Sequence, residues 1–537
     1  MNEATHEVLN QPPPLAGYDA WASDAWLRAA VERAGAGDVA AQASALGRFV
    51  GGAEAQEHAR LANRHGPELR THDRFGHRID AVEYHPSYHA LMSHAIGAGV
   101  HSLAWKRPQA GFASRAALFY LWNQLEQGTA CPVTMTFASI PIFAHAPSLE
   151  ARWRAKLLAD AYDPRPLPFS QKSGVTIGMA MTEKQGGSDL RAVATRAERD
   201  GEARRLTGHK WFCSAPMSDG FFTLAREEAG VGCFFVPRSL PDGTRNVFEI
   251  QRLKEKVGNR SNASAEVEYR GTWAEPVGEA GRGIATLIEM AHHTRFDIVV
   301  GVAGMMRAAL DQALHHARHR SAFGRRLAEH PLMANVLADL ALETEAALLV
   351  AFRLAAAFDA SAASEGERDL QRILTPVAKY WLCKRMTPVA TEAMECLGGN
   401  GYVEDGPLAR LYREAPLNGI WEGSANVICL DALRAIARSP RALEALRAEV
   451  EAGREPRAIA LADRAAQMLR AGEAAERDAR AIVEALALAV QASLMKRHSD
   501  ARAAEAFCRS RLAATHAFGT LDSGIDTAAL LRRAARE

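Results

Sequence analysis

The spacing of hydrophobic residues changes twice along this chain. From Asp19 to about Leu158 apolar residues recur at helical intervals, and from about Gly174 they alternate with polar ones, which is the pattern of strands. Beyond Gly278 the helical interval returns and dominates. We therefore expect an α+β protein, mostly α, in which two helical regions flank one antiparallel β domain.

Turn residues define the strand pairs of the β region. Residues 192–197 and 205–208 flank an Asp200-Gly201 turn and predict a hairpin. Residues 220–225 and 232–236 predict a second pair. Residues 246–250 and 265–269 alternate as half-buried strands.

The second helical region divides where its composition changes. Its first part has one apolar helix face, formed by Leu332, Val336, Leu340, Thr344 and Leu348. After about Ser439 the chain is rich in Ala, Arg and Glu, which is typical of an appended helical domain. The expected domains are residues 1–174 (an N-terminal extension and helical domain), 175–277 (β), 278–438 (helical) and 439–537 (C-terminal helical).

The N-terminus carries a Pro-rich segment, Gln11-Pro12-Pro13-Pro14-Leu15. Consecutive prolines favour extended, semi-rigid chain. A disordered tail and an arm lying on another subunit are the two interpretations.

Composition excludes several classes of protein. The 537 residues exceed one compact core, and 64 Lys+Arg against 63 Asp+Glu leave a net charge of +1, so no global field recommends DNA or membranes. The seven cysteines form no C-x-x-C pair, so neither a metal site nor a disulfide framework is indicated. The chain starts without a signal-peptide pattern and has no apolar run of membrane length, so we expect a cytoplasmic protein.

Four short segments carry candidate chemistry. Residues 420–426 place Glu422 beside Trp421 and before Gly423-Ser424, which suits a buried acid or base against a flat ligand. On this segment alone a helix N-terminus capped by Ser424 or Asn426 is favoured. Residues 181–189 form a Gly-rich polar loop, residues 208–214 an aromatic strand, and residues 320–327 a basic helix end; each also has an ordinary structural interpretation.

Taken together, these motifs resemble those of acyl-CoA dehydrogenases, in order and near-family spacing, over roughly Ser170–Leu433. The matching residues are Thr182…Gly187-Ser188-Asp189, Gly208-x-Lys210-Trp211, Arg320-x-x-Phe323-Gly324, residues 397–402 (LGGNGY) and Trp421-Glu422-Gly423-Ser424. Residues 181–189 (MTEKQGGSD) and 253–262 (LKEKVGNRSN), the N-terminal extension and the extra C-terminal domain resemble the AidB-type adaptive-response (alkylation-response) proteins.

The resemblance implies the acyl-CoA-dehydrogenase fold: a helical domain, a β-barrel domain (175–277) and a four-helix bundle (278–438), here followed by the extra helical domain. It also implies FAD held between barrel and bundle of a homotetramer, a dimer of dimers. The contacts to the flavin and its surroundings would be Met181, Thr182, Gly187, Ser188, Trp211, Phe212, Ser214, Trp421, Gly423, Ser424 and Asn426.

The ADP part of FAD would be held by Arg320, Phe323, Gly398, Gly399 and Gly401, partly across a subunit boundary. One motif is ambiguous: the family's Trp-x-Thr matches either Trp211-x-Cys213 or Phe212-x-Ser214, and the second match keeps a hydroxyl. Glu395 stands where many members have Gln.

The resemblance also implies a reaction, in which a carboxylate removes the α-proton of a thioester and a hydride passes to the flavin. Glu422 occupies the base position of most members. Isovaleryl-type members carry the base before an Arg on an earlier helix, and that place here is Thr294, before Arg295. Glu422 is therefore the predicted base, with Arg295 on the substrate side.

The predicted function is that of an AidB-type flavoprotein protecting DNA in the alkylation response, with weak α,β-dehydrogenation of short or branched acyl-CoA such as isovaleryl-CoA. The alternatives are an ordinary metabolic acyl-CoA dehydrogenase and a non-catalytic, flavin-bound DNA-binding scaffold. Candidate contacts to double-stranded DNA, each also interpretable as a solvated helix position, are Arg438, Arg441, Lys496, Arg497, Arg509 and Arg511.

Overall fold

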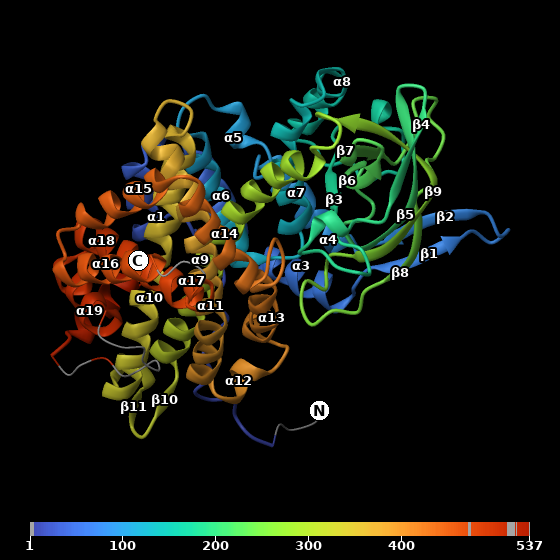
Figure 1. Ribbon diagram of the computed structural model, residues 1–537. Helices are drawn as coiled ribbons and strands as arrows, with labels where there is room; N and C mark the ends of the chain where they lie inside the picture. Colours follow the sequence, from blue (N-terminus) through green and yellow to red (C-terminus); the bar gives the residue numbers. More distant parts are fainter. Residues whose placement is uncertain (1–4, 471–473, 513–520, 522–523, 536–537) are drawn as a thin grey trace. The chain divides into compact units, whose positions relative to one another are not determined.

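The computed structural model describes residues 5–470, 474–512, 521 and 524–535. The chain divides into two compact units, which we call the barrel unit (residues 54–297) and the bundle unit (residues 1–53 and 298–537) (Figure 1). No helix within the described ranges combines the length and the apolar character of a membrane span.

The strands of the barrel unit close into a ring. β6 pairs with β7, β7 with β9, β9 with β5, β5 with β4, and β4 pairs back to β6. β3 extends the sheet from β6, and β8 pairs with β9. The strands are β3 (Ile177–Ala180), β4 (Arg196–Asp200), β5 (Ala203–Ser214), β6 (Gly220–Glu227), β7 (Gly230–Pro237), β8 (Glu249–Leu253) and β9 (Ser264–Val277).

The predicted hairpins are confirmed, but the expectation of a purely antiparallel domain is wrong. β4–β5 and β6–β7 are antiparallel, whereas β3 and β4 each run parallel to β6. Parallel neighbours need a crossover connection, and here the chain between β3 and β6 supplies it by way of β4 and β5. Inward-facing apolar side chains such as Leu206, Phe221 and Val267 fill the barrel.

Most helices of the barrel unit precede the sheet in the chain, and the first part of α9 follows it. They are α3 (Ala53–Arg64), α4 (Pro86–Gly97), α5 (Leu103–Lys106), α6 (Gly111–Leu125), α7 (Ala130–Phe143), α8 (Pro147–Leu157) and the first part of α9 (Gly283–His319). α6 and α7 are buried almost throughout, and α7 packs against β3. Arg115 of α6 and Asp297 of α9 form a buried two-bond ion pair.

A β-hairpin interrupts the region that was expected to be helical up to Leu158. β1 (Glu68–His72) and β2 (Arg78–Glu83) pair antiparallel and project from the barrel unit (Figure 1). Asp73 closes the turn by accepting the N–H groups of Phe75 and His77. The hairpin was missed because its strands are too polar to show an alternating hydrophobic pattern.

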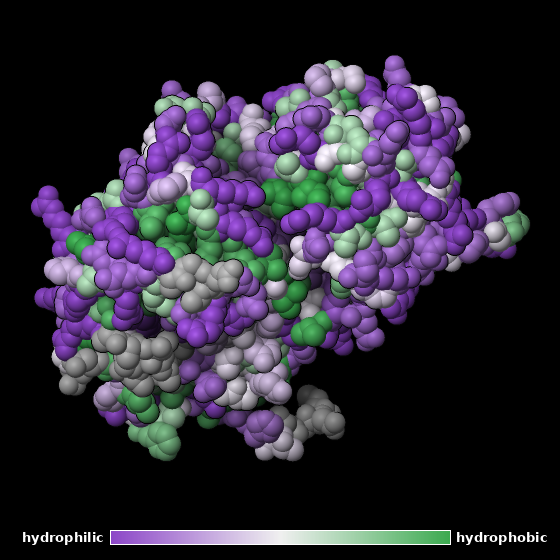
Figure 2. All heavy atoms as spheres, in the orientation of Figure 1, coloured by the Kyte–Doolittle hydropathy of each residue, from purple (hydrophilic) through white to green (hydrophobic). Residues whose placement is uncertain are grey.

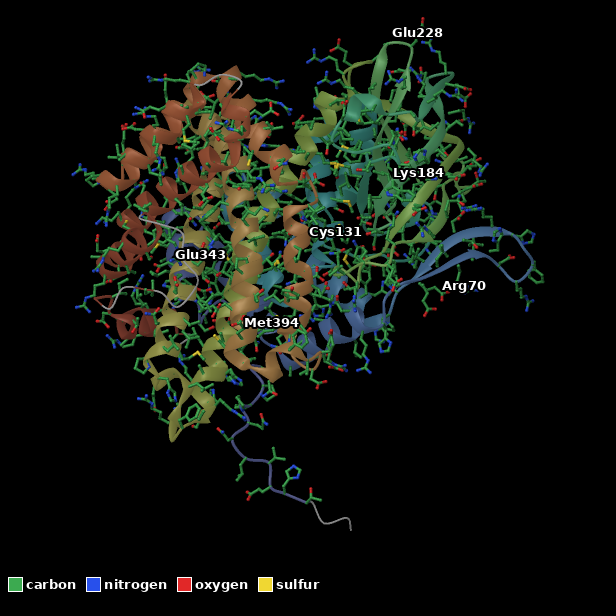
Figure 3. All side chains as sticks on the ribbon, turned by 60° about the horizontal axis from the view of Figure 1, so that its bottom comes forward. Arg70, Cys131, Lys184, Glu228, Glu343 and Met394 are labelled. Carbon is green, nitrogen blue, oxygen red and sulfur yellow. The ribbon has the colours of Figure 1, made fainter. Side chains whose placement is uncertain are left out.

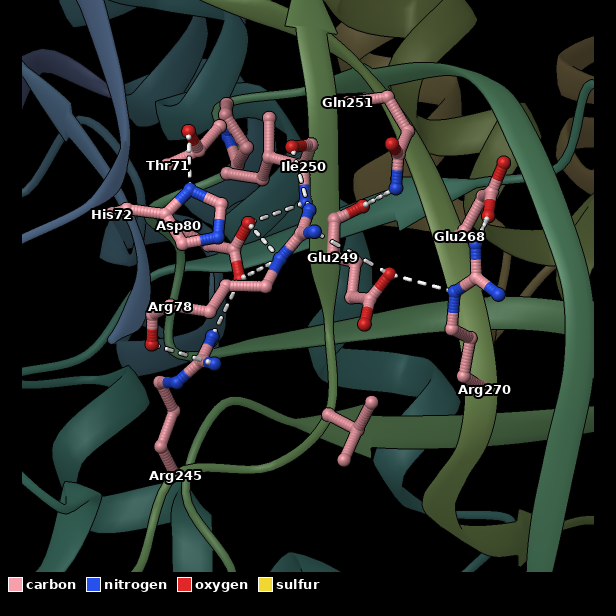
Figure 4. A network of polar contacts seen from close by, with 12 residues as sticks. Thr71, His72, Arg78, Asp80, Arg245, Glu249, Ile250, Gln251, Glu268 and Arg270 are labelled. Atoms are coloured by element: carbon pink, nitrogen blue, oxygen red, sulfur yellow. Dashed lines mark hydrogen bonds and ion pairs between the residues drawn. The ribbon is translucent and has the colours of Figure 1, made fainter. Parts of the chain in front are cut away.

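A polar network fixes this hairpin to β8 (Figure 4). Asp80, fully buried with φ +44°, accepts hydrogen bonds from the Arg78 and Arg245 guanidinium groups and from the N–H of Ile250. The base of the hairpin is therefore rigid, while Phe75 near its tip is exposed. Figure 2 shows a small hydrophobic spot at the tip among hydrophilic atoms.

The bundle unit is built on four long helices: the rest of α9, α10 (Pro331–Ala360), α11 (Glu365–Leu397) and α14 (Ala425–Arg438). α1 (Ala25–Arg33) and α2 (Ala40–Val50) belong to the same unit. On α10 the predicted apolar face is confirmed at Leu340, Thr344 and Leu348, whereas Leu332 is exposed because it lies in the first turn of the helix.

Short elements connect the long helices. The hairpin β10 (Ser321–Ala322) and β11 (Arg325–Arg326) joins α9 to α10, and α12 (Gly399–Tyr402), α13 (Pro407–Glu414) and a 3-10 turn (Ala415–Gly419) join α11 to α14. The prediction of a mostly helical molecule with one β domain and additional C-terminal helices is confirmed.

The C-terminal helices pack directly onto the bundle. They are α15 (Pro440–Glu451), α16 (Pro456–Leu469), α17 (Ala474–Arg477), α18 (Ala479–His498), α19 (Ala501–Arg511) and α20 (Thr527–Ala534). α18 is buried along most of its length and contacts α10, α11 and α14. These helices therefore share one core with the bundle rather than forming a separate globule.

Buried ion pairs join these helices to α10. Arg511 of α19 contacts both Asp339 and Glu343, and Arg533 of α20 contacts Glu345 at 2.7 Å. Figure 3 shows Glu343 among the helices of the bundle unit. The pKa of Glu343 is lowered although burial alone would raise it, because Arg385 and Arg511 stabilise the carboxylate.

Removing the Arg511 guanidinium should destabilise the bundle unit. Arg511→Ala leaves Asp339 and Glu343 buried with reduced compensation, and we expect a loss of about 3–5 kcal/mol, measured as a fall in Tm. Arg438→Ala, at an exposed position at the end of α14, is the matched control and should change stability by less than about 0.5 kcal/mol. Equal Tm values for the two variants would contradict a stabilising role of the ion pair.

Candidate functional site

The loop of residues 181–189 in the barrel unit is organised around the buried carboxylate of Glu183. Its oxygens accept hydrogen bonds from Lys210 Nζ at 2.7 Å, the Thr195 hydroxyl at 2.6 Å, the Ala194 N–H at 2.7 Å and the Gln185 side chain at 2.6 Å. Lys210, on β5, is fully buried and also donates to the carbonyl of Leu224. One ion pair thus links the loop to the wall of the barrel.

The surroundings of Glu183 favour its charged form. Burial acts to raise its pKa, but Lys210 and the donors from Thr195 and Ala194 outweigh burial and lower the pKa to about 2. Glu183 is therefore ionised at neutral pH, and it holds the loop rather than exchanging protons with a ligand.

The predicted ligand contacts of this loop are more accessible than Glu183. Thr182 and Met181 are half-buried and Ser188 is exposed. The carbonyl of Thr182 accepts the N–H of Trp211 at 2.8 Å, which fixes the loop against β5. A Cβ on Gly187 would lie 2.4 Å from the Thr182 hydroxyl oxygen, so only glycine fits beside that hydroxyl.

The end of β5 presents two aromatic rings. Phe212 is 50% exposed, and Trp211 is half-buried with the Lys254 ammonium 3.2 Å from its ring centroid. The register of β5 against β9 shifts between Lys210 and Cys213, so both rings lie in an irregular part of the strand.

This geometry bears on the ambiguous motif. Cys213 is fully buried in the barrel core, whereas Ser214 is partly exposed and its hydroxyl lies 3.5 Å from that of Ser264. Of the two matched positions, Ser214 is the accessible one. Its role as a flavin contact stays a prediction.

In the bundle unit, Glu422 lies in a strained backbone segment. Its φ is +57°, a conformation that non-glycine residues seldom adopt, and Gly423 follows with φ +106°. Lys379 of α11, buried, donates to the carbonyls of Trp421 at 2.8 Å and Gly423 at 2.6 Å. This clamp fixes the carbonyls on both sides of Glu422, whose carboxylate oxygen Oε2 is buried.

The residues after Glu422 begin α14. Ser424 occupies the N-cap position but its side chain makes no capping hydrogen bond. Asn426 is exposed and accepts a hydrogen bond from Arg480 of α18 at 2.8 Å. The hydroxyl of Ser424 is therefore not used for capping, while the amide oxygen of Asn426 is engaged by the C-terminal helices.

The predicted contacts to the ADP part surround the β10–β11 hairpin and α12. Arg320, half-buried, follows α9, and Phe323 at the tip of the hairpin is 97% exposed with φ +52°. Figure 2 shows a hydrophobic spot at the end of this hairpin. Gly398 and Gly399 border open space, whereas a Cβ on Gly401 would lie 2.3 Å from the carbonyl of Met394. Gly401 is thus required for packing.

The alternative position for the base, on α9, carries no carboxylate side chain. Thr294 is buried and its hydroxyl donates to the carbonyl of Ala291 at 3.0 Å. Arg295, the predicted substrate-side residue, is also buried, at 8% exposure. Arg295 belongs to the barrel unit and directly follows Thr294 on α9.

The candidate DNA contacts differ in accessibility. Arg511 is buried in its pairs with Asp339 and Glu343, so its guanidinium is not available to phosphates, and its prediction as a DNA contact is corrected. Arg441, Lys496 and Arg497 are engaged with acidic partners, namely Glu365 and Asp369, Glu455, and Glu449. Arg438 and Arg509 are exposed.

Three polar residues were missed or undervalued in the sequence: Glu183, Lys210 and Lys379. The signal for Lys379 is a single charge in the apolar run 377–382 (VAKYWL), which indicates a buried lysine with fixed partners. Lys210 is one of three buried positions of β5, with Leu206 and Cys213, in a strand whose other residues are half-buried or exposed.

Each unit carries residue types that suit part of a flavin dinucleotide. The barrel unit supplies hydroxyls, accessible backbone and exposed aromatic rings, and the bundle unit supplies a carboxylate, a guanidinium and glycines facing open space. Aromatic rings suit contact with a flat ring system, and a guanidinium suits a diphosphate.

Comparison with known families agrees with this assignment. Residues 10–164 match the model described as the adaptive response protein AidB N-terminal domain, residues 178–272 the acyl-CoA dehydrogenase middle domain, and residues 281–437 the acyl-CoA dehydrogenase C-terminal domain. The chain therefore belongs to the acyl-CoA dehydrogenase family, whose members bind FAD.

Within that family the chain belongs with AidB. It is 47% identical to AidB of Escherichia coli (strain K12) over 441 residues, which is 81% of each chain. It is 31% identical to acyl-CoA dehydrogenase family member 11 of Caenorhabditis elegans over 77% of this chain and 69% of that protein. The crystal structure of C. elegans ACDH-11 in complex with C11-CoA superposes with a TM-score of 0.87 at 26% identity, covering 96% and 95% of the two chains.

The fold extends to more distant members. An acyl-CoA dehydrogenase of Bacillus anthracis complexed with FAD superposes with a TM-score of 0.70 at 17% identity, covering 93% of this chain and 92% of that one. At this identity the likeness shows the fold.

The Glu183–Lys210 pair should make the barrel unit sensitive to acid. The folded pKa of Glu183, about 2, lies below its ordinary 4.5, so its contribution to stability is complete above about pH 4.5 and is lost as the pH falls towards 2. We expect the Tm of the Glu183→Gln/Lys210→Met variant to fall less between pH 6 and pH 3 than that of the unmodified protein.

The single variant Lys210→Met is the control, and it should respond to acid differently from the unmodified protein. This variant leaves the Glu183 carboxylate buried without its ammonium partner, so protonation of Glu183 should become favourable. The Tm difference between the variant and the unmodified protein should therefore become smaller as the pH falls. Parallel pH profiles for all three proteins would contradict a stabilising ion pair at this position.

Proposed function

We propose that this protein is an FAD-dependent dehydrogenase of acyl-CoA thioesters in which Glu422 is the catalytic base. The observation that carries the proposal is the Lys379 clamp, which holds Glu422 in a left-handed backbone conformation with one carboxylate oxygen buried. Strained backbone that is fixed by surrounding hydrogen bonds is typical of functional sites.

The chain's own residues account for the proton transfer. The Glu422 carboxylate takes the proton from the α-carbon of the thioester. When bound, FAD supplies the acceptor for the hydride that leaves the β-carbon. Lys379 fixes the backbone on both sides of Glu422 through the carbonyls of Trp421 and Gly423. Thr294 lacks a carboxylate, so the α9 position cannot act as the base.

Two observations bear on the length of the acyl chain in the proposed substrate. The family resemblance favours short or branched chains such as isovaleryl-CoA, and the structural neighbour from C. elegans is a complex with C11-CoA. A series from isovaleryl-CoA to C11-CoA, with bleaching of the flavin absorbance as the readout, distinguishes the two. Rapid bleaching favours an ordinary metabolic dehydrogenase, slow bleaching favours the AidB-type role, and none favours a scaffold.

Glu422→Gln and Glu422→Ala should separate chemistry from cofactor binding. We expect flavin reduction by the best acyl-CoA to slow by roughly 10²–10⁴-fold, because a positioned general base contributes a factor of that size, while FAD stays bound. Stopped-flow absorbance measures the reduction. Glu444→Gln, an exposed glutamate of α15, is the control and should react normally. Unchanged reduction in the Glu422 variants would refute this assignment.

We also propose that the protein protects DNA in the alkylation response, as a cytoplasmic homotetramer. The relationship to AidB supports the role, and the 97% exposed ring of Phe323 supports a contact between subunits. Arg511 is excluded from the candidate DNA contacts because it is buried, and Arg441, Lys496 and Arg497 would have to release acidic partners. Arg438 and Arg509 are tested first because both are exposed.

Duplex DNA binding should depend on salt and on these exposed arginines. In a fluorescence-polarisation titration at two salt concentrations, Arg438→Glu/Arg509→Glu should weaken binding and flatten the salt dependence by about two counterions. Arg191→Glu, an exposed arginine of the barrel unit, is the charge-matched control. Binding that is insensitive to salt, or equally weakened by both changes, would exclude this surface.

A further inference from the structure

The N-terminal arm, which we define as residues 10–13, lies along the bundle unit. The carbonyl of Pro13 accepts a hydrogen bond from His315 Nε2 at 2.7 Å, near the end of α9, and the Gln11 side chain lies 3.4 Å from the Asn400 amide of α12. The arm therefore connects the two elements that carry the predicted contacts to the ADP part of FAD. Its Pro-rich sequence suits an extended segment of this kind.

Asn10 is the best-fixed residue of the arm. Its side-chain amide makes two hydrogen bonds with the main chain of Ser321: Nδ2 donates to the carbonyl and Oδ1 accepts the N–H, both at 2.8 Å. Its φ is +57°, a conformation that asparagine tolerates better than most residues. The amide thus pairs with Ser321 much as a neighbouring strand would.

The same residue binds Arg320, which directly precedes Ser321. The Nη1 group of Arg320 donates to the main-chain carbonyl of Asn10 at 2.5 Å. A guanidinium carries five N–H donors in a fixed plane. One contact to a carbonyl therefore orients the plane and leaves donors for a second, anionic partner.

We propose that Asn10 is a positioning residue for the cofactor: it orients Arg320 so that the remaining guanidinium N–H groups face the diphosphate of a flavin dinucleotide. The inference rests on the proposed function, because that function assigns Arg320 to the ADP part of FAD. Pre-orientation lowers the entropy that the long arginine side chain loses on binding. The arm is thus part of the binding machinery and not merely a tether.

If the arm instead inhibits FAD binding, the Kd for FAD should change in the opposite direction. If the Asn10 carbonyl competed with the diphosphate for Arg320, removing the arm's attachment would tighten FAD binding. The sign of the change in Kd therefore decides between positioning and competition.

The decisive variant is Asn10→Gly, measured in the full-length protein after removal of FAD. Glycine keeps the positive φ and the main-chain carbonyl but removes the amide that pairs with Ser321. We expect the Kd for FAD, measured by quenching of flavin fluorescence, to rise about tenfold. Arg320→Ala should raise it roughly 10- to 100-fold, and the double variant should be no weaker than Arg320→Ala alone.

The control variant is Leu9→Ala, at an exposed position that immediately precedes the arm and lies outside it. Its Kd for FAD should change by less than about twofold, and the Tm of its FAD-free form should match that of Asn10→Gly. A merely structural role of Asn10 would move the Tm of the FAD-free protein and leave the Kd unchanged.

Several results would overturn the inference. An unchanged or lower Kd in Asn10→Gly, together with a raised Kd in Arg320→Ala, would refute the role of the arm alone. Additive effects in the double variant would show that Asn10 acts independently of Arg320. An unchanged Kd in Arg320→Ala would refute the proposed assignment of Arg320 and the inference with it.

Discussion

The hydrogen bonds from the Lys379 ammonium to the carbonyls of Trp421 and Gly423 are the interaction on which the proposed chemistry depends. A buried ammonium is costly unless it is fully bonded, so the lysine and the two carbonyls hold each other in place. Between these carbonyls lies Glu422, in a backbone conformation that few residues adopt unaided. A buried charge in the helix α11 thus determines where the proposed base is held.

The barrel unit uses the same principle with a different pair. Lys210 of the sheet binds Glu183, and Glu183 gathers the donors of Thr195, Ala194 and Gln185. The motif of residues 181–189 thus has two parts: one part contacts ligand in the proposed function, and the other part only holds the loop. Glu183 belongs to the second group.

Local pattern predicted much of this molecule. The turn at Asp200-Gly201, the strand pair 220–225 with 232–236 and the long helices were visible as periodicity, and the ligand motifs were visible because each lies within a few residues of sequence. The polar β1–β2 hairpin lacked such periodicity. The clamps on Glu422 and Glu183 and the pairing of Asn10 with Ser321 join distant segments, so no spacing rule foretells them. The irregular strand at Trp211 and Phe212 likewise could not be read from the sequence, so periodicity alone left the match between Cys213 and Ser214 ambiguous.

The ion pairs between α10 and the C-terminal helices determine what happens when the chain is shortened. Asp339, Glu343 and Glu345 are carboxylates of α10 whose partners lie more than 150 residues downstream. A bundle that lacks the last helices would leave these carboxylates without Arg511 and Arg533, and only Glu343 would keep Arg385 of α11. We therefore expect a shortened version of this protein to be more stable when these carboxylates of α10 are replaced by apolar or neutral residues.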